Sequence, residues 1–245
     1  MESYTITINS TYVSGTLSFE SKAPAYYPCG PVEPGSDLVV APSVGWANAL
    51  ADADADALVS LFVGGTAIDW SDIGYHDKNW GTEFFGSTFN SWYWGHVRVG
   101  PYRLVWFSML APGDQQYLGG YLAKDGEVVN ASCGPSSVIV RPVGTPYPRG
   151  SDPNWPLVYQ ISICISEGET LNVTVEQTGV IISLEGSRRL IGRATGSVNG
   201  GFQPEAMANG RSCVRPYDSD KHVALLQFKG SPILIYNHYT GPTAL

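Results

Sequence analysis

Short runs of alternating apolar and polar residues, separated by glycine turns, dominate this sequence from residue 58 onward. Period-two alternation puts successive side chains on opposite faces, which is the geometry of a β-strand rather than a helix. Asp125-Gly126 lies between two such runs, and glycine there accepts the positive φ that a two-residue hairpin turn demands. The pattern therefore predicts strands joined by tight turns, with under about a tenth of the residues in helix.

The predicted strands form one long consecutive series. They cover residues 12–19, 58–63, 66–70, 92–99, 102–109, 115–123, 127–132, 136–141, 157–166, 170–177, 179–186, 189–198, 222–228 and 232–239. An antiparallel series of this length avoids exposed edges most simply by closing into a barrel around a ligand-sized cavity. We therefore expect an all-β fold with a single antiparallel β-barrel from residue 58 onward. Residues 23–42 contain five prolines and are expected to form a linker ahead of it.

Charge and composition argue against two classes of partner. Twenty-two acidic side chains against fourteen basic ones give a formal net charge of −8, which disfavours a nucleic-acid partner. The sequence has no run of about 18 apolar residues, and its first ten residues lack the basic start and apolar core of a signal peptide, so we expect no membrane span. Sequons at Asn9, Asn130 and Asn172 leave the compartment open between the cytoplasm and the secretory pathway.

The cysteines do not form a recognisable metal or redox motif. They are Cys29, Cys133, Cys164 and Cys213. They are scattered and include no C-x-x-C pair, so buried thiols are the favoured interpretation. Disulfides among them are left open, because the sequons point to an oxidising compartment only if the chain is secreted.

An acidic stretch invites a calcium-loop interpretation. Asp52, Asp54 and Asp56 have the right spacing, but Ala57 stands where the loop needs glycine and Val63 where it needs glutamate. We therefore expect a solvated acidic turn that leads into a strand. The sequence also lacks a P-loop, a nucleophile elbow and a close histidine pair, so we expect neither a metal nor a cofactor.

Two neighbouring segments are too polar for a core strand and too aromatic for a loop tip: IGYHDKNWG at 73–81 and SWYWGHV at 91–97. With a period of two, Tyr75, Asp77 and Asn79 share one face; His76, Lys78 and Trp80 share the other; and Trp92, Trp94 and His96 share a face of the next strand. This arrangement predicts that Trp80, Trp92 and Trp94 border the largest apolar cavity. A buried polar network, in which His76 and Asp77 tie a loop to the barrel, is an equal alternative.

These segments carry a family resemblance. GYHDKNWG, followed by WYWGHV and YRLVWFSML, resembles the lipocalin-like family that contains the carotenoid 1,2-hydratases and the fungal Diels-Alderases of secondary metabolism. The upstream GWANALADADADAL is similar to a fungal segment that reads G-W-x-N-A and then P-D-A, with Leu50 and Ala51 where proline would be expected. The resemblance runs from about Tyr12 to the C-terminus. It implies that residues 1–42 are the end of a first lipocalin-like domain plus a linker, and that 43–245 form a lipocalin-like barrel.

The resemblance also implies a function. It is that of a cofactor-free cyclase, which folds an apolar polyene for a [4+2] Diels-Alder-type cycloaddition by confinement and a hydrogen-bond donor. The implied catalytic residues are His76, Asp77, Lys78 and Asn79. The implied substrate-binding residues are Tyr75, Trp80, Trp92, Tyr93, Trp94, His96 and Trp106. A missing N-terminal domain or a second chain would complete the pocket.

Two other functions fit the same residues. An isoprenoid hydratase or isomerase would use Asp69, Asp72 or Asp77 as its acid, with His76 beside it. Such an acid needs a raised pKa and hence burial. A lipocalin-like carrier would use the aromatic side chains only to hold an apolar ligand.

Overall fold

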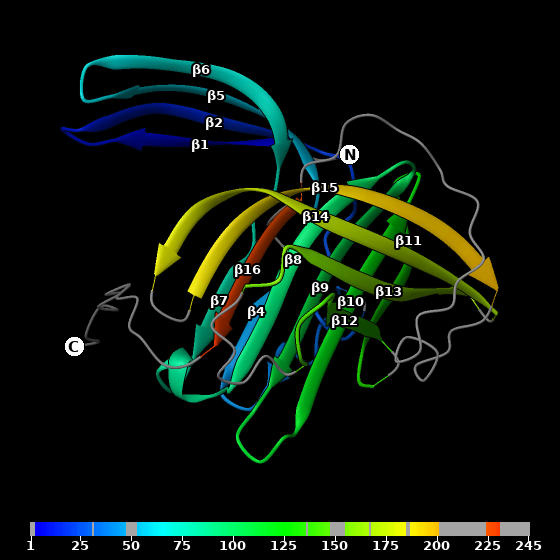
Figure 1. Ribbon diagram of the computed structural model, residues 1–245. Coiled ribbons are helices and arrows are strands. Elements are labelled where there is room, and N and C mark those ends of the chain that lie inside the picture. Colours follow the sequence, from blue (N-terminus) through cyan, green and yellow to red (C-terminus); the bar gives the residue numbers. More distant parts are fainter. Residues whose placement is uncertain are drawn as a thin grey trace.

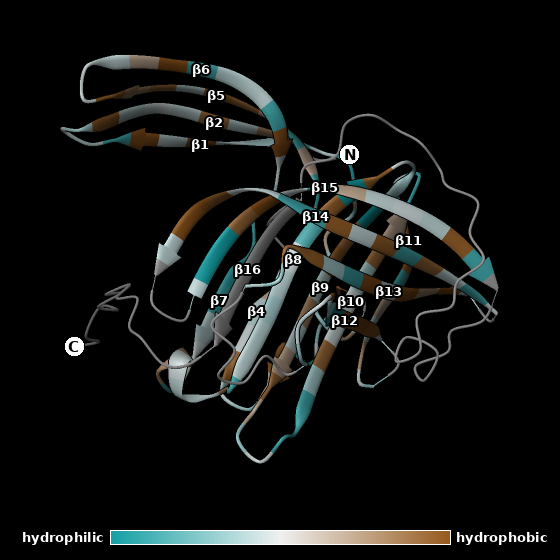
Figure 2. Cartoon of the chain, viewed as in Figure 1, coloured by the Kyte–Doolittle hydropathy of each residue, from teal (hydrophilic) through white to brown (hydrophobic). Residues whose placement is uncertain are grey.

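The computed structural model describes residues 3–30, 32–47, 53–135, 137–147, 155–166, 168–184, 187–200 and, as backbone, 224–230 (Figure 1). Its strands are β1 (Ser3–Asn9), β2 (Val13–Ser21), β3 (Val39–Ala41), β4 (Val44–Ala47), β5 (Ala55–Val63), β6 (Thr66–Gly74), β7 (Lys78–Gly81), β8 (Ser91–Val99), β9 (Tyr102–Leu110), β10 (Gln116–Lys124), β11 (Glu127–Cys133), β12 (Val138–Pro142), β13 (Val158–Ser166), β14 (Glu169–Leu184), β15 (Ser187–Gly200) and β16 (Ala224–Gly230). One 3-10 turn, η1, spans Phe85–Ser87. Apolar and polar residues alternate along strands such as β1 and β13 (Figure 2).

Nine strands form an antiparallel sheet in the order β11-β10-β9-β8-β16-β15-β14-β13-β12. The sheet curls until its two edges approach each other, so that β11 contacts β13 and β12 contacts β9 and β10. Across this seam, the Asn130 side-chain amide donates a hydrogen bond to the carbonyl oxygen of Cys164 at 2.8 Å. The predicted all-β antiparallel barrel is thereby confirmed. Between Lys124 and Glu127, Asp125 and Gly126 both have positive φ, as the predicted hairpin turn requires.

The inner, concave face of the barrel holds the larger apolar cluster. It joins side chains from β8 to β10 with side chains from β12 to β15. Trp106 and Tyr159 are among its fully buried members. A second cluster lies on the outer face of β8, β9 and β10, where β3, β4 and the segment around Tyr26 cover them. Strand β8 therefore contributes to both clusters, through alternate side chains.

The prediction of one barrel from residue 58 onward is wrong for its first two strands. β5 and β6 pair with β1 and β2 in a separate four-stranded sheet, in the order β1-β2-β5-β6. Figure 1 shows this sheet projecting beyond the barrel. Alternation predicts that a segment is a strand, but it is a local signal and does not select the strand's partner. In the same way, the predicted strands at 170–177 and 179–186 are one strand, β14. The predicted strand at 232–239 lies outside the described residues.

The proline-rich stretch is not a free linker. The Tyr26 ring stacks on the Tyr121 ring of β10 at 4.0 Å, and the Tyr121 hydroxyl donates to the carbonyl oxygen of Pro24 at 2.8 Å. A disulfide joins Cys29 to Cys133, 104 residues further along. The favoured interpretation of buried thiols is therefore wrong for these two cysteines, because folding brings together side chains that are far apart in the sequence. Cys164 is a free thiol, and Cys213 lies outside the described residues.

The acidic stretch is not a solvated turn either. Asp54 is buried, with 1% of its surface exposed. Its carboxylate forms ion pairs with Arg98 of β8 and Arg103 of β9, each at 2.8 Å. Asp56 is exposed and pairs with Arg98 at 2.9 Å, whereas Asp52 lies outside the described residues. A buried carboxylate needs such partners, and here they fasten the start of β5 to the barrel.

Candidate functional site

The segment 73–81 lies against the outer face of the barrel, where the three-stranded sheet β3-β4-β7 holds it. Trp46 of β4 pairs across the sheet with Asn79 of β7, and Gly45 pairs with Trp80. A Cβ on Gly45 would lie 2.2 Å from the Trp80 indole, so glycine permits that indole to cross β4. This pairing places the side chain of Asp77 next to β4.

Asp77 is the centre of a hydrogen-bond network. Its Oδ2 accepts hydrogen bonds from the indole N–H of Trp46 at 2.6 Å and from the hydroxyl of Tyr75 at 2.8 Å. Its Oδ1 accepts one from the side-chain amide of Asn79 at 3.2 Å. Burial raises the pKa of the Asp77 carboxyl above its ordinary value, although these hydrogen bonds act in the opposite direction. The group is thus a carboxyl held in a fixed orientation, with a pKa above its ordinary value.

Tyr75 connects this carboxyl to the aromatic side chains of β8. Its ring stacks on the His96 imidazole with centroids 4.6 Å apart, and it meets the Trp94 indole edge-on at 5.1 Å. His96 is 5% exposed. Burial lowers the pKa of His96 to about 3, so its imidazole is neutral at physiological pH.

Three buried nitrogens on this face of β8 have no hydrogen-bond partner within the described residues. They are Trp92 Nε1, Trp94 Nε1 and His96 Nδ1. The indole nitrogens are donors, whereas His96 Nδ1 donates or accepts according to its tautomer. Leaving a buried polar group unpaired costs about 1 to 3 kcal/mol, so each such group calls for an explanation.

The structure divides the predicted site residues into separate groups. Trp92, Trp94 and His96 share a face, as predicted, and Tyr75 and Asn79 meet at Asp77. Tyr93 and Trp106 lie on the opposite, concave face of the barrel wall. His76 faces the four-stranded sheet, where its Nδ1 is hydrogen-bonded to the Tyr4 hydroxyl at 2.7 Å.

The remaining predicted residues are exposed. Lys78 and Asn79 lie on the exposed strand β7. Trp80 is 44% exposed and makes no ring contact with Trp92 or Trp94 among the described residues. Asp69 and Asp72 are exposed on β6, so Asp77 is the one partly buried carboxyl of the three considered as an acid. Trp46, which the sequence interpretation did not assign to the site, could have been found through its place in the G-W-x-N-A motif.

No metal or membrane feature adds to this site. In the part of the chain that the structure covers, no group of three His, Cys, Asp or Glu side chains is placed to hold a metal ion. Among those same residues, no helix is long and apolar enough to cross a membrane.

The sequence model of the Diels-Alderase-like family matches residues 1–137, which include Asp77 and all three β8 side chains of the site. The chain belongs to the Diels-Alderase-like family. It is 33% identical over 211 residues to the quinolone epoxide rearrangement protein penF of Penicillium thymicola, a match that covers 84% of this chain and 57% of that protein. It is 31% identical over 209 residues to the quinolone epoxide rearrangement protein asqO of Emericella nidulans, with the same shares covered.

The chain thus spans little more than half the length of these relatives. Its fold is similar to the crystal structure of CghA with Sch210972, with a TM-score of 0.65 and 17% sequence identity. That match covers 94% of this chain and 65% of CghA. At this identity the likeness establishes the fold alone.

Proposed function

We propose that this chain contributes the reacting site of a cofactor-free cyclase of secondary metabolism, and that the reaction rearranges an epoxide on a conjugated, apolar substrate. The observation that carries the proposal is Asp77, an oriented and partly buried carboxyl with a raised pKa. The unpartnered nitrogens of Trp92 and Trp94 lie on β8, where Trp94 contacts Tyr75, a hydrogen-bond donor to Asp77. The relatives penF and asqO, both named quinolone epoxide rearrangement proteins, support an epoxide as the reacting group.

The proposed step is a proton transfer coupled to bond cleavage. Asp77 donates its proton to the epoxide oxygen while one C–O bond breaks, and the bonding electron pair stays on that oxygen as it becomes a hydroxyl. The electron-poor carbon is then attacked by a π-bond of the same molecule. A proton lost from the rearranged skeleton returns to the carboxylate, so substrate and product are isomers and no cofactor takes part. Trp92 and Trp94 donate hydrogen bonds to a second substrate oxygen, such as a carbonyl.

A second candidate is the [4+2] cycloaddition, and the unpartnered indole donors favour it specifically. A donor aimed at the carbonyl of a dienophile stabilises charge that develops in the transition state, and confinement supplies most of the remaining rate. In that reaction the indole N–H groups of Trp92 and Trp94 are the donors to this carbonyl. Asp77 then only orients Tyr75, which stacks on His96.

Two substitutions in the full-length natural protein separate the candidates. With a quinolone epoxide as substrate, Asp77→Asn should lower kcat by about a hundredfold or more, because the amide cannot donate an acidic proton. Asp72→Asn, which changes an exposed carboxyl near the end of β6, should leave kcat within about twofold. Trp94→Phe, which removes one N–H and keeps the aromatic volume, should cost about tenfold.

The pH profile completes the test. If Asp77 is the acid, the rate should fall as the pH rises through the raised pKa of its carboxyl, and it should be slower in heavy water. A flat profile, with Asp77→Asn no worse than Trp94→Phe, would reject the acid role and leave the cycloaddition. Binding of the epoxide with no turnover by the wild type would reject both and favour a carrier.

A further polypeptide, either a preceding domain or a second chain, completes the protein in this proposal. The support is a cross-strand apolar row on the four-stranded sheet, in which Ile6, Leu17, Val59 and Trp70 are in register. The Trp70 side chain is 49% exposed there, and a large apolar side chain on an open sheet face is typical of a surface that another polypeptide covers. The proposed division at residue 42 is crossed by the pairing of β2 with β5. Native mass spectrometry of the natural protein would reveal the extra domain or chain, and a lone 26.4 kDa species would contradict it.

A further inference from the structure

Two arginines at one end of the barrel stack on aromatic rings and have no carboxylate partner among the residues that the structure describes. The Arg188 guanidinium lies 4.7 Å from the Trp155 ring centroid, and the Arg141 guanidinium lies 4.0 Å from that of Tyr147. Within the described residues, the ion pairs involve only Lys22, Arg98 and Arg103 as cations. In a chain of net charge −8, two cations with no counter-ion in the described part of the chain make the described residues at this end of the barrel locally positive.

Arg188 points to the concave face of the barrel. It pairs with Phe228 of the central strand β16, and Phe228 pairs in turn with Tyr93 of β8. Residues in register share a face, so Arg188 is on the same face as Tyr93. Its Nε is buried and has no hydrogen-bond partner within the part of the chain that the structure describes. Stacking on Trp155 uses the face of the guanidinium and leaves its N–H edge for a ligand.

Aromatic rings lie between this cation and the inner cluster of the barrel. Tyr147 and Trp155 are partly exposed, so solvent reaches them, and both pack against the inner cluster. Below them, Tyr93 lies 5.9 Å from Tyr147 and 6.3 Å from Tyr159, with both distances between ring centroids. A guanidinium with an unpartnered Nε beside partly exposed aromatic rings suits a flat conjugated molecule that ends in an anion.

Deeper in the barrel, more polar groups are unpaired. Within the described residues, Trp106 Nε1 and Ser108 Oγ are buried and have no hydrogen-bond partner. Ser108 pairs in register with Tyr93, and Trp106 lies two residues further along the same face of β9. Both groups would donate hydrogen bonds to a carbonyl oxygen at the far end of a bound molecule.

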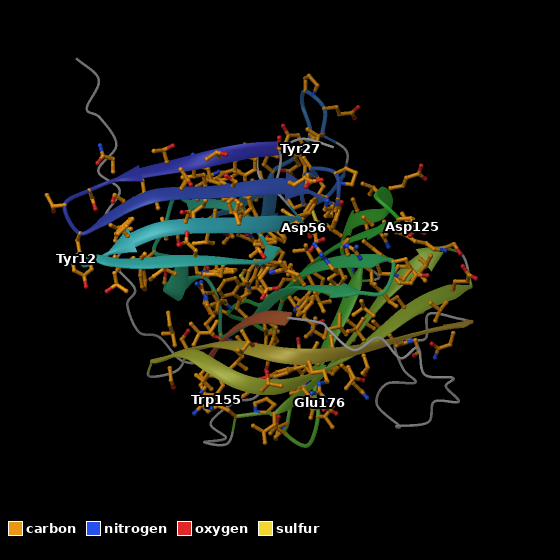
Figure 3. The ribbon with its side chains drawn as sticks, turned by 90° about the horizontal axis from the view of Figure 1, so that it is seen from above. Tyr12, Tyr27, Asp56, Asp125, Trp155 and Glu176 are labelled. Carbon is orange, nitrogen blue, oxygen red and sulfur yellow. A yellow bond between two sulfur atoms is a disulfide. The ribbon has the colours of Figure 1, made fainter. Side chains whose placement is uncertain are left out.

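We propose that this end of the barrel, formed by Arg188, Trp155, Tyr147, Tyr93 and Tyr159, is a second binding site for a conjugated carboxylate. It is distinct from the site at Asp77, because Tyr93 and Trp94 point to opposite faces of β8. Figure 3 shows Trp155 on the far side of the barrel from the sheet that carries Tyr12 and Asp56. The carboxylate binds the N–H edge of Arg188, and the conjugated body lies among the tyrosines.

Isothermal titration of the full chain with 2-naphthoate, and with its neutral counterpart 2-naphthamide, tests the site. The wild type should bind the carboxylate at least about tenfold more tightly than the amide, since hydrogen bonds to a charged group contribute about 1.5 to 3 kcal/mol. Arg188→Gln should remove that preference. Arg193→Gln is the matched control, because it makes the same charge change at an exposed position of the same strand and should alter the affinity by less than about twofold.

Two further variants keep the outcome decisive. Arg188→Lys keeps the positive charge but loses the pair of N–H groups that can bind both carboxylate oxygens, so it should bind naphthoate with intermediate affinity. This variant keeps the test decisive even where the glutamine variant does not fold. Asp77→Asn should leave naphthoate binding unchanged, which separates this site from the proposed reacting site. Equal affinity of the wild type for naphthoate and naphthamide would overturn the proposal. Equal losses of naphthoate affinity in Arg188→Gln and Arg193→Gln would also overturn it, because they would show that only the overall surface charge attracts the anion.

Discussion

The buried imidazole of His96 should make the stability of the fold depend on pH in a way that one substitution removes. Its ring is 5% exposed, stacked on Tyr75, and lacks a hydrogen-bond partner for Nδ1 among the described residues. Burial lowers the pKa of His96 from 6.5 to about 3. Below about pH 6.5 the unfolded chain therefore binds a proton that the folded chain binds only near pH 3.

The sign and size of the effect follow from this difference. Between the two pKa values the unfolded state holds more protons, so the free energy of unfolding rises with pH and falls as the solution is acidified. At about 1.4 kcal/mol per unit, lowering the pH from 7 to 5 should cost about 2 kcal/mol through His96 alone, and the full window corresponds to about 5 kcal/mol.

Urea unfolding of the wild type and of His96→Gln at several pH values measures the effect. The difference in unfolding free energy between the two proteins is the useful quantity, because it cancels the titration of all other groups, including Asp77. The unfolding free energy of the wild type minus that of His96→Gln should fall by about 2 kcal/mol when the pH is lowered from 7 to 5. Trp94→Phe, a non-titrating change in the same cluster, should show a constant difference from the wild type. A constant difference for His96→Gln as well would refute the reasoning.

Two further predictions concern how the outer segments are fastened to the barrel. Reducing the Cys29–Cys133 disulfide, or replacing both cysteines by serine, should destabilise the chain by about 4 to 5 kcal/mol, since the closed loop is about 104 residues long. An unchanged thermal midpoint in reductant would contradict this. Asp54→Asn should lower the free energy of unfolding by about 3 kcal/mol, because Arg103 loses its carboxylate partner while Arg98 keeps Asp56. Asp56→Asn, at an exposed position, should lower it by under about 1 kcal/mol. Equal losses in urea unfolding would argue against the buried pair as the fastening.

Local patterns in the sequence predict much of this structure, and the long-range contacts are where they fail. The turn at Asp125-Gly126 and the shared face of Trp92 and Trp94 both follow from rules that span a few residues. The choice of partner for β5 does not, because β2 and any barrel strand offer the same backbone groups. Pairings across 31 or more residues, such as Trp46 with Asp77, depend on the completed fold.

The same limit explains which site residues could be predicted. Tyr75, Asp77 and Asn79 are two residues apart, and the sequence correctly brings them together. His76 was expected on one face with Lys78 and Trp80 or in a network that ties a loop to the barrel, yet it bonds to Tyr4 of a sheet that the sequence did not separate from the barrel. Burial was equally hidden, since the acidic stretch has a solvated composition and Asp54 is nonetheless buried by two arginines from β8 and β9.

Strand β8 can serve two sites because it is covered on both faces. An antiparallel strand with one face in water alternates apolar and polar residues, whereas β8 is apolar or aromatic on both faces and is buried along nearly its whole length. Its outward side chains, Trp94 and His96, meet Tyr75 and thereby Asp77, and its inward Tyr93 meets the rings below Arg188. Because Tyr93 and Trp94 are adjacent in one strand, their side chains point to opposite sides of it, and the two proposed sites lie on opposite faces of β8.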